Sequence, residues 1–228
     1  MQAVFMAGGL GTRLRPITLD TPKPMIRVNG RPFLEHQISF LKKQGIKEFL
    51  LCVGYLHEKV VEHFGDGRGL GVGIQYSVED KPLGTGGALK NAENKIEQVF
   101  MVLNADTYLP IDYPKLVGFY RKKKKKAVMV LYDNHEKLMV NNARLGGDGL
   151  VQAYNKESSE GMTHVDAGTY LFNKRVLSLI PAGREVSLET EVLPKLIEGK
   201  ELAGYVTGQR FYDMGTPERL RETEEVLR

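Results

Sequence analysis

Short apolar runs that alternate with segments of helical period constrain the fold of this chain more than any other feature. Each run reads as a strand, and in the segments between them the apolar residues recur three and four positions apart, as on one face of a helix. The expected strands cover 3–7, 49–53, 73–78, 99–103 and 127–132, and the expected helices cover 33–44, 57–64, 86–96 and 113–123. This alternation predicts an α/β fold with a largely parallel sheet.

The pattern is less regular in the second half of the chain. Shorter strands are expected near 151–154 and 165–172, with helices at 174–180 and around 189–197. The chain has 228 residues and shows no internal repeat, low-complexity linker or break in composition. We therefore expect a single domain that spans 1–228.

Composition narrows the classes of partner. The net charge of +4 is mild, and the basic run at 121–126 has no aromatic residues among its lysines, which favours a solvated helix end over a nucleic-acid site. Cys52 is the single cysteine and is expected to be a buried structural thiol. No signal pattern and no apolar stretch of about twenty residues is present, so we expect a cytoplasmic protein without nucleic-acid or membrane partners.

The segment AGGLGTRLRPITLDTPKPM directly follows the first apolar run and is rich in glycines and cations. In α/β sheets ligands bind beyond the carboxyl ends of the strands, where this loop begins. Glycines let backbone N–H groups approach a phosphate or a base, and Arg13 can donate two hydrogen bonds to phosphate. Lys23 directly precedes Pro24, which favours a lysine side chain that points into a site over one that extends into solvent. The spacing fits neither a P-loop nor a dinucleotide fingerprint, so a tight turn and a phosphate cradle both remain open.

Two aspartates follow other strands. Asp106, in LNADTYL, stands just past an apolar run and suits Mg²⁺, although a helix-cap or turn aspartate is the alternative. Asp213, in FYDMGTPE, precedes a turn into a terminal helix and reads equally well as a capping residue. It gains functional meaning only if it faces Asp106.

Two further segments carry weaker signals. PLGTGGA is a second glycine turn that opens a helix, and its backbone donors would suit a base or an anion. Lys156 ends the strand VQAYNKE, where a surface lysine is the simpler interpretation. The five histidines show no metal-ligand spacing, and CxxC and GxSxG motifs are absent, so zinc and hydrolase functions have little support.

These segments, in this order, resemble the sugar-1-phosphate nucleotidyltransferase family, and together they span almost the whole chain. YSVEDKPLGTGGALKNA and the LNADTY block are most similar to heptose-1-phosphate guanylyltransferases. Uridylyl-, thymidylyl- and mannose-1-phosphate guanylyl-transferases share the same landmarks. The resemblance implies a Rossmann-like, GT-A-like three-layer sandwich with a mostly parallel mixed sheet. It also implies a nucleotide-binding half at about 1–130 and a sugar-phosphate-binding half at about 131–228.

The resemblance further implies a reaction in which a nucleoside triphosphate and a sugar 1-phosphate give a nucleoside-diphosphate sugar and pyrophosphate, with GTP and a heptose 1-phosphate as the expected pair. A phosphate monoester has a second pKa of about 6, so the sugar phosphate is already a dianionic nucleophile at neutral pH. No general base is then required, and positioning and charge neutralisation remain for the protein.

Roles for individual residues follow from the resemblance. Asp106 and Asp213 would hold Mg²⁺, Arg13 and Lys23 would stabilise the pyrophosphate, and Lys156 would bind the sugar phosphate. The nucleotide would contact Ala7, Gly8, Gly9, Gly11, Thr12, Arg13, Lys23, Gly84, Thr85 and Asn104. The sugar phosphate would contact Asn155, Lys156, Asp166 and Glu189. A monomer or a small homo-oligomer is expected.

The chain departs from the family pattern in its second half. Asn155 stands where Glu is common, and Asp166 stands where Asn is common, so altered sugar specificity is an open alternative. A nucleotide-sugar-binding regulatory subunit is the alternative from another class, but it predicts loss of the cations and carboxylates, which are present. A glycosyltransferase would not explain Arg13 and Lys23, because it expels no pyrophosphate.

Overall fold

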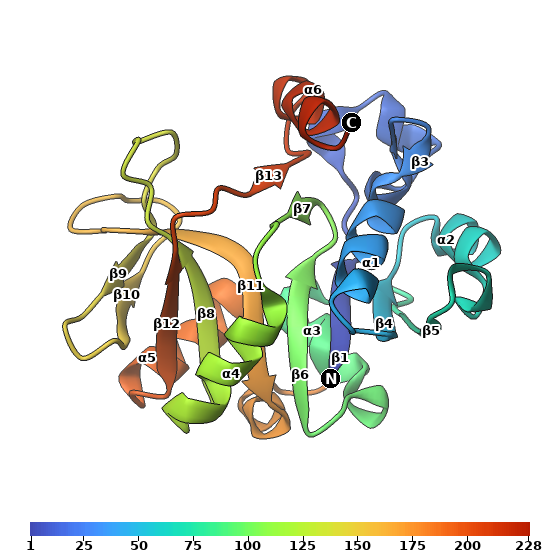
Figure 1. Ribbon diagram of the computed structural model, residues 1–228. Coiled ribbons are helices and arrows are strands. Elements are labelled where there is room, and N and C mark those ends of the chain that lie inside the picture. Colours follow the sequence, from blue (N-terminus) through green and yellow to red (C-terminus); the bar gives the residue numbers. More distant parts are fainter.

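A seven-stranded mixed sheet forms the centre of the molecule, which the computed structural model describes over residues 1–228 (Figure 1). Its strand order is β12-β8-β11-β6-β1-β4-β5. The strands are β1 (Gln2–Ala7), β4 (Glu48–Val53), β5 (Gly73–Val78), β6 (Val99–Asn104), β8 (Ala127–Tyr132), β11 (Val165–Asn173) and β12 (Leu202–Thr207). All neighbours are parallel except β11, which runs antiparallel to both β6 and β8. The predicted mostly parallel mixed sheet is confirmed.

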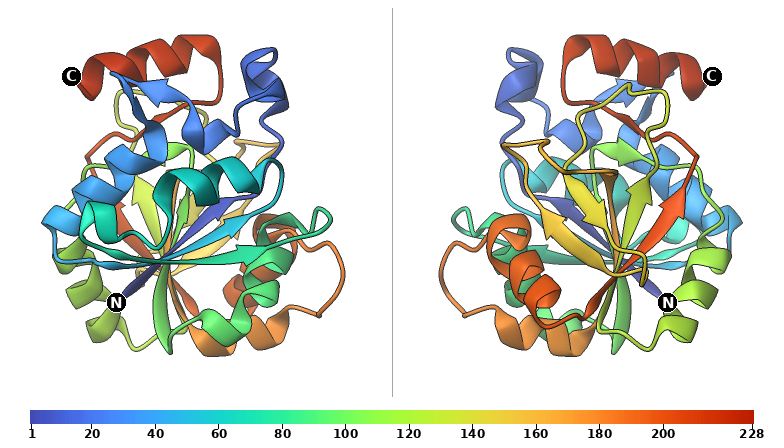
Figure 2. Two further views of the ribbon diagram at one scale, coloured as in Figure 1. Left: turned by 90° about the vertical axis from the view of Figure 1, so that its right-hand side faces the viewer. Right: turned by 90° about the vertical axis from the view of Figure 1, so that its left-hand side faces the viewer.

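Two apolar cores lie on opposite faces of this sheet, because successive strand residues point to opposite sides. One core packs the sheet against α1 (Phe33–Lys43), α2 (His57–Phe64) and α4 (Tyr113–Lys123). The other packs it against α3 (Gly84–Asn91) and α5 (Leu193–Glu198). Figure 2 looks along the sheet and shows α2 and α3 on opposite sides of the edge strand β5. The result is the predicted three-layer sandwich.

The first-half helices form where the apolar period placed them. In α1 the stripe of Leu34, Ile38 and Leu41 is buried, and the chain leaves the helix at Gly45 with a positive φ of 85°. This is the left-handed conformation that glycine adopts without steric cost after a helix. The basic run forms the last turn of α4 and the residues after it.

Some predicted elements differ in extent or type. The helix expected over 86–96 begins at Gly84 and ends at Asn91, and a short 3-10 turn at Glu93–Lys95 follows it. The helix expected over 174–180 is a 3-10 helix, Lys174–Leu179. The helix expected around 189–197 begins as a π-turn, Leu188–Val192, that continues into α5.

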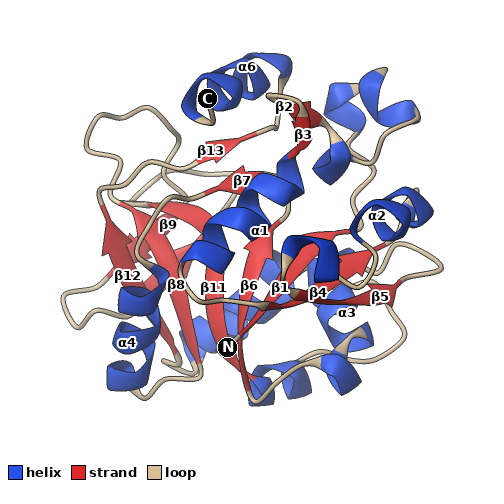
Figure 3. Ribbon diagram, turned by 45° about the vertical axis from the view of Figure 1, so that its right-hand side comes forward, coloured by secondary structure: helices blue, strands red, loops and turns tan.

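The strand expected near 151–154 is confirmed as β10 (Val151–Tyr154), whereas several other short elements were not predicted. β10 pairs with β9 (Ala143–Leu145), and this hairpin covers part of the second core. β7 (Thr107–Tyr108) pairs with β13 (Tyr212–Asp213), and β2 (Arg27–Val28) pairs with β3 (Arg31–Pro32). Figure 3 shows β7 and β13 side by side below the terminal helix α6 (Pro217–Val226).

A third, small apolar cluster joins α6 to the glycine-rich loop. Leu14 of that loop and Met214 are buried in it, and Leu220 of α6 and Leu227, the residue after α6, pack against it. Thr216 caps α6 by accepting a hydrogen bond from the N–H of Arg219. The end of the chain is therefore held against the loop that follows β1.

Two other expectations can be compared with the structure. Cys52 is a free, buried thiol in β4, and burial raises its pKa to about 12, so the predicted structural role is confirmed. None of the helices has the length and apolar character that crossing a membrane requires.

Candidate active site

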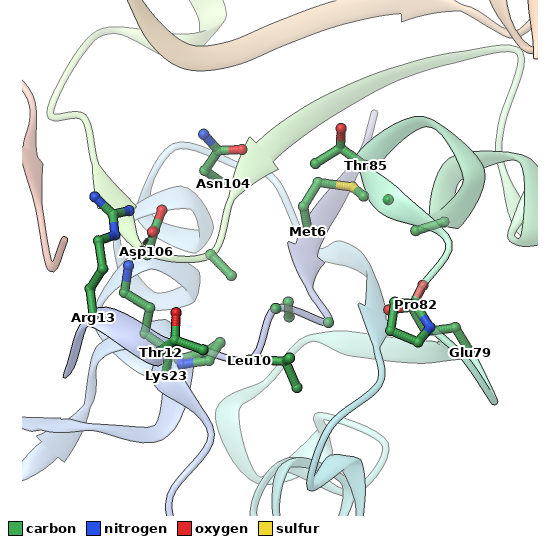
Figure 4. A pocket seen from close by; sticks show the side chains of 18 of the residues that line it. Met6, Leu10, Thr12, Arg13, Lys23, Glu79, Pro82, Thr85, Asn104 and Asp106 are labelled. Carbon is green, nitrogen blue, oxygen red and sulfur yellow. Dashed lines mark hydrogen bonds and ion pairs between the residues drawn. The ribbon is translucent and has the colours of Figure 1, made fainter. Parts of the chain in front are cut away.

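A pocket of about 460 Å³ opens at the carboxyl ends of β1 and β6 (Figure 4). The predicted residues that line it are Ala7, Gly8, Gly9, Gly11, Thr12, Arg13, Lys23, Gly84, Thr85, Asn104, Asp106 and Glu189. The predicted residues Asn155, Lys156, Asp166 and Asp213 do not line it and lie in neighbouring segments. Segments far apart in the sequence thus converge on one cavity, as the carboxyl-end rule for α/β sheets expects.

The glycine-rich loop is a chain of tight turns. Three short 3-10 turns occupy it, at Thr12–Leu14, Ile17–Leu19 and Lys23–Met25. Gly11 has a positive φ of 61°, and its carbonyl accepts a hydrogen bond from the buried Thr18 hydroxyl at 2.9 Å. Gly11 is therefore required for its conformation, and the loop is internally fixed.

Glu79 is a pocket residue that the sequence analysis did not identify. It directly follows β5, and its Oε1 lies 2.5 Å and 2.9 Å from where Cβ atoms of Gly8 and Gly54 would be. The two glycines therefore make room for a carboxylate in the pocket wall. The position of Glu79 at the carboxyl end of a strand was the signal available in the sequence.

Environment shifts the proton affinity of this carboxyl group. Burial raises the pKa of Glu79, the N–H of Leu83 lowers it, and the charge of Glu185 raises it again, so that it lies above its ordinary value. Leu83 donates that N–H to Oε2 at 3.3 Å. Oε1 has no hydrogen-bond donor from the chain and remains able to accept one.

The opposite end of the pocket carries cations. In Figure 4, Glu79 and Pro82 lie at one end, and Arg13, Lys23 and Asp106 lie at the other. Lys23 forms an ion pair with Asp106, and Asp106 also accepts a hydrogen bond from the Thr107 hydroxyl at 3.1 Å. The Lys23 side chain is only 12 % exposed, so it is aimed into the site rather than into solvent.

The pairing of β7 with β13 brings Asp213 next to the Asp106 segment. Asp213 is opposite Thr107 in the ladder, and Met214 donates its N–H to the Asp106 carbonyl at 3.0 Å. The Asp213 carboxylate accepts the N–H of Gly215 at 2.6 Å and pairs with Arg219 of α6 at 2.8 Å. The sequence condition for a functional Asp213 was that it faces Asp106. The structure brings the backbones of the two segments together, while Asp213 itself does not line the pocket, so its role stays a prediction.

The donor set at this end is compatible with Mg²⁺. Asp106 precedes β7 and Asp213 ends the neighbouring β13, and both carboxylates are paired with basic side chains. Mg²⁺ is commonly held by one or two carboxylates together with substrate phosphates. No group of three or more His, Cys, Asp and Glu side chains is close enough to hold a metal. Phosphate oxygens and water would therefore complete the coordination.

The second glycine turn has a different use from the one expected. Gly86 and Gly87 donate their N–H groups to the carbonyl of Val186, at 2.8 and 3.1 Å. Gly84 has a φ of 69°, and a Cβ there would lie 2.6 Å from the same oxygen. The expectation that this helix start offers free donors was wrong for Gly86 and Gly87, because another backbone segment packs against it.

Lys156 and Glu189 meet at the edge of the pocket. Lys156 Nζ lies 3.1 Å from Glu189 Oε1, and the Thr85 hydroxyl donates to Glu189 Oε2 at 2.6 Å. Burial raises the pKa of Glu189, but the hydrogen bond from Thr85 and the charge of Lys156 outweigh it and hold the pKa below its ordinary value. Glu189 is therefore ionised at neutral pH.

The side chains of Asn155 and Asp166 both accept hydrogen bonds from groups of the chain itself. The Asn155 side chain accepts the N–H of Glu157 at 2.8 Å and holds a turn. Asp166 accepts the N–H of Gly168 at 3.0 Å and the Tyr170 hydroxyl, and burial raises its pKa to about 6.

A glycine-walled pocket at the carboxyl ends of a mostly parallel sheet, with a carboxylate at one end and cations at the other, defines an α/β nucleotide-binding protein. The family model for nucleotidyl transferases matches residues 2–228, and the chain belongs to this family. Together with its relatives, this makes the chain a sugar-1-phosphate nucleotidyltransferase and confirms the family resemblance.

Curated relatives are similar over most of the chain. A D-glycero-alpha-D-manno-heptose 1-phosphate guanylyltransferase of Aneurinibacillus thermoaerophilus is 32% identical, covering 100% of this chain and 98% of the relative. The enzyme of the same name from Campylobacter jejuni is 35% identical and covers 96% of each chain. A mannose-1-phosphate guanylyltransferase of Mycobacterium tuberculosis is 37% identical over 96% of this chain, which spans only 62% of that longer relative.

Solved structures agree with these relatives. HddC from Yersinia pseudotuberculosis, crystallised in complex with GMP-PN, superposes with a TM-score of 0.83 at 29% identity and covers 100% of this chain and 99% of its own. A glucose-1-phosphate thymidylyltransferase from Bacillus anthracis, described as putative, has a TM-score of 0.86 at 24% identity over 100% and 95%, which shows the shared fold.

Proposed function

We propose that this enzyme transfers a guanylyl group from GTP to a heptose 1-phosphate and releases pyrophosphate. The single observation that carries the choice of base is the Glu79 carboxylate in the pocket wall. The choice of heptose is supported by relatives of that name that match over nearly the full length of both chains. Mannose 1-phosphate is the second candidate, supported by the mycobacterial relative.

A carboxylate distinguishes guanine from the pyrimidines by hydrogen bonding. Guanine presents two adjacent donors, its N1–H and its 2-amino group, and an ionised carboxylate accepts two parallel hydrogen bonds from such an edge. Uracil and thymine present one N–H between two carbonyl oxygens, which a carboxylate repels. Glu79 Oε1, which no donor of the chain occupies, therefore favours GTP over UTP and dTTP.

The cation-rich end of the pocket would bind the triphosphate. Arg13 and Lys23 would donate hydrogen bonds to the departing pyrophosphate and offset the charge that develops on it. Asp106 and Asp213 would hold Mg²⁺, which when bound would neutralise phosphate charge. The glycines at the end of β1 would let the nucleotide approach the backbone closely.

Attack on the α-phosphate needs a positioned dianion rather than a base. The sugar phosphate, with a second pKa of about 6, is mostly dianionic at neutral pH. Lys156, 51 % exposed at the pocket edge, would bind this phosphate and orient its oxygen for in-line attack.

The first experiment measures pyrophosphate release with Mg²⁺ across five nucleoside triphosphates and a panel of heptose, mannose, glucose and N-acetylhexosamine 1-phosphates. We expect release only with GTP and with a heptose 1-phosphate. Release with UTP or dTTP in preference to GTP would contradict the role of Glu79. Nucleotide binding without turnover on any sugar phosphate would instead support the regulatory-subunit alternative.

Glu79→Gln tests the base assignment directly. Glutamine is isosteric but accepts only one of the two hydrogen bonds, so kcat/KM for GTP should fall about 10- to 100-fold, as expected for hydrogen bonds to a charged group. The preference for GTP over ITP, which lacks the 2-amino group, should fall as well. Asp80→Asn, a neighbouring exposed carboxylate outside the pocket, is the matched control and should change neither value.

Asp106→Asn tests the metal assignment. The amide keeps the shape of the side chain but lacks its charge, so turnover should fall at least about 100-fold while the fold is retained, since charge stabilisation is a large term in such sites. Circular dichroism and the dependence of turnover on Mg²⁺ concentration check both parts. Near-normal activity with unchanged Mg²⁺ dependence would remove Asp106 from the site.

A further inference from the structure

Glu189 joins the two binding regions of the site. Its side chain is 11 % exposed, and its two carboxylate oxygens face different partners. Oε1 pairs with Lys156 at 3.1 Å. Oε2 accepts the Thr85 hydroxyl at 2.6 Å and the Ser187 hydroxyl at 3.1 Å. A carboxylate has about four acceptor positions, so the chain itself already uses most of them.

Thr85 connects this carboxylate to the nucleotide pocket. Its side chain lines the pocket, and its hydroxyl also accepts the N–H of Leu188 at 2.8 Å. The Thr85 hydroxyl therefore accepts a hydrogen bond from Leu188 and donates its own hydrogen to Glu189. A nucleotide that contacts Thr85 would therefore affect Glu189 through the hydrogen bond between the two side chains.

The segment that carries Glu189 is docked on the start of α3. Val186 donates its N–H to the Leu83 carbonyl at 2.8 Å and accepts the N–H groups of Gly86 and Gly87. Ser187 caps the π-turn Leu188–Val192 by accepting the N–H of Thr190. The start of α3, which lines the pocket, and the segment that carries Glu189 therefore form one hydrogen-bonded unit. Lys156 belongs to a different segment, which follows β10.

We propose that Glu189 is a positioning residue that holds Lys156 ready for the sugar phosphate and, through Thr85, couples its placement to the bound nucleotide. The inference rests on the proposed function, in which Lys156 binds the sugar phosphate. An exposed lysine alone samples many rotamers, and an ion pair to a buried carboxylate restricts them before the substrate arrives. Half-exposed ion pairs add little to stability, so placement is the main effect of this one.

Coupling of this kind is reciprocal. If bound nucleotide orders Thr85 and Glu189, it raises the affinity for the sugar phosphate, and the sugar phosphate raises the affinity for the nucleotide by the same factor. The lowered pKa of Glu189 keeps the carboxylate charged through the neutral range in which the transferase would work.

Glu189→Gln is the first test. Glutamine can still accept the Thr85 hydrogen bond, but its amide group faces Lys156 and releases it. With the sugar phosphate and nucleotide that the wild type turns over, KM for the sugar phosphate should rise about tenfold, whereas KM for the nucleotide and the melting temperature should change little. An unchanged KM for the sugar phosphate would overturn the inference.

Glu191→Gln is the matched control. Glu191 lies in the same π-turn, pairs with Arg184 at 2.7 Å on the surface, and does not line the pocket. Removing its charge should leave both KM values unchanged. A tenfold rise in this variant as well would mean that any charge lost from the turn disturbs the site, and the inference would fail.

Thr85→Val and Thr85→Ser test the coupling. The affinity of the sugar 1-phosphate is measured by calorimetry with and without a non-hydrolysable GTP analogue. We expect the wild type and Thr85→Ser to bind the sugar phosphate more tightly with the analogue present, and Thr85→Val to show a ratio near one. A ratio retained in Thr85→Val would overturn the coupling. A wild type without turnover on any substrate pair would overturn the proposed function, and this inference with it.

Discussion

Asp166 in β11 carries a charge that its surroundings disfavour. Burial raises its pKa from 3.8 to about 6, although Tyr170 and the N–H of Gly168 donate hydrogen bonds to it. The folded state therefore binds this proton more tightly than the unfolded state does. Stability is lost as pH rises from about 4 through 6, and the full cost is present above about 6.

Asp166→Asn removes that cost. Its free energy of unfolding at pH 7.5 should exceed that of the wild type by about 1–3 kcal/mol, because one pKa unit corresponds to about 1.4 kcal/mol. At pH 4.5 the gain should shrink to less than half. Urea denaturation at both pH values measures it, with Asp80→Asn as an exposed control. An equal gain at both pH values would mean that the charge of Asp166 is not the cause.

Gly54 lies next to Glu79 but outside the pocket lining, so a substitution there tests the role of Glu79 in base selection. Gly54 does not line the cavity, yet a Cβ there would lie 2.9 Å from Glu79 Oε1 and 3.0 Å from its Cγ. Gly54→Ala should displace the carboxylate and lower the preference for GTP over ITP at least threefold, on the scale of one weakened hydrogen bond. Gly69→Ala, where a Cβ meets nothing within 4 Å, is the control for adding a methyl group.

Among the helices, α6 supports one side of the cation-rich end of the pocket, because it packs against the glycine-rich loop. Thr223 is fully buried, and its single hydroxyl hydrogen is shared between two carbonyl oxygens, that of Arg219 at 2.8 Å and that of Asp213 at 3.1 Å. Thr223→Val keeps the volume but leaves the Asp213 carbonyl without this donor. The free energy of unfolding should fall by about 1–3 kcal/mol, the usual cost of a buried unpaired group.

The same variant should also affect the site. Asp213 would be held less firmly, so higher Mg²⁺ concentrations should be needed for half-maximal pyrophosphate release. Glu225→Gln, an exposed change on the same helix, should alter neither stability nor Mg²⁺ dependence. If Thr223→Val loses stability without a change in Mg²⁺ dependence, α6 supports the fold but does not position Asp213.

Elements with strong periodicity were predictable, and elements defined by their partners were not. The stripe of Leu34, Ile38 and Leu41 defines α1 from sequence alone. In β12, with the sequence LAGYVT, Ala and Gly interrupt the residues that favour a strand, and pairing with β8 completes it. The antiparallel direction of β11 was likewise invisible, because a strand's own sequence does not encode the orientation of its neighbours.

The pocket residues that directly follow a predicted strand could be found from the sequence. Asp106 and the glycine-rich loop follow short, fully apolar runs, and the carboxyl-end rule places them together. Glu79 was missed because it opens the polar run EDKP, which reads as a turn. The proximity of Asp213 to Asp106 depends on β7 and β13, which have two residues each and no period to detect.

At the scale of the whole molecule, the site lies where the sheet, the glycine-rich loop and α6 meet. Both expected metal ligands form ion pairs within the chain, Asp106 with Lys23 and Asp213 with Arg219. Mg²⁺ alone must compete with these cations. A triphosphate offers Lys23 another anion and so leaves Asp106 available to Mg²⁺.

Mg²⁺ and nucleotide should therefore stabilise the protein together more than separately. The Mg²⁺ complex of a non-hydrolysable GTP analogue, at about 100 times its Kd, should add about 2.7 kcal/mol and raise Tm by about 5–10 °C for a chain of this size. Mg²⁺ alone should raise Tm by less than about 1 °C, and EDTA should abolish the part of the Tm shift that depends on Mg²⁺. Asp106→Asn should bind the analogue but lose the response to Mg²⁺. A large shift with Mg²⁺ alone would mean that the carboxylates are free before nucleotide arrives, and that the two ion pairs do not govern access to the site.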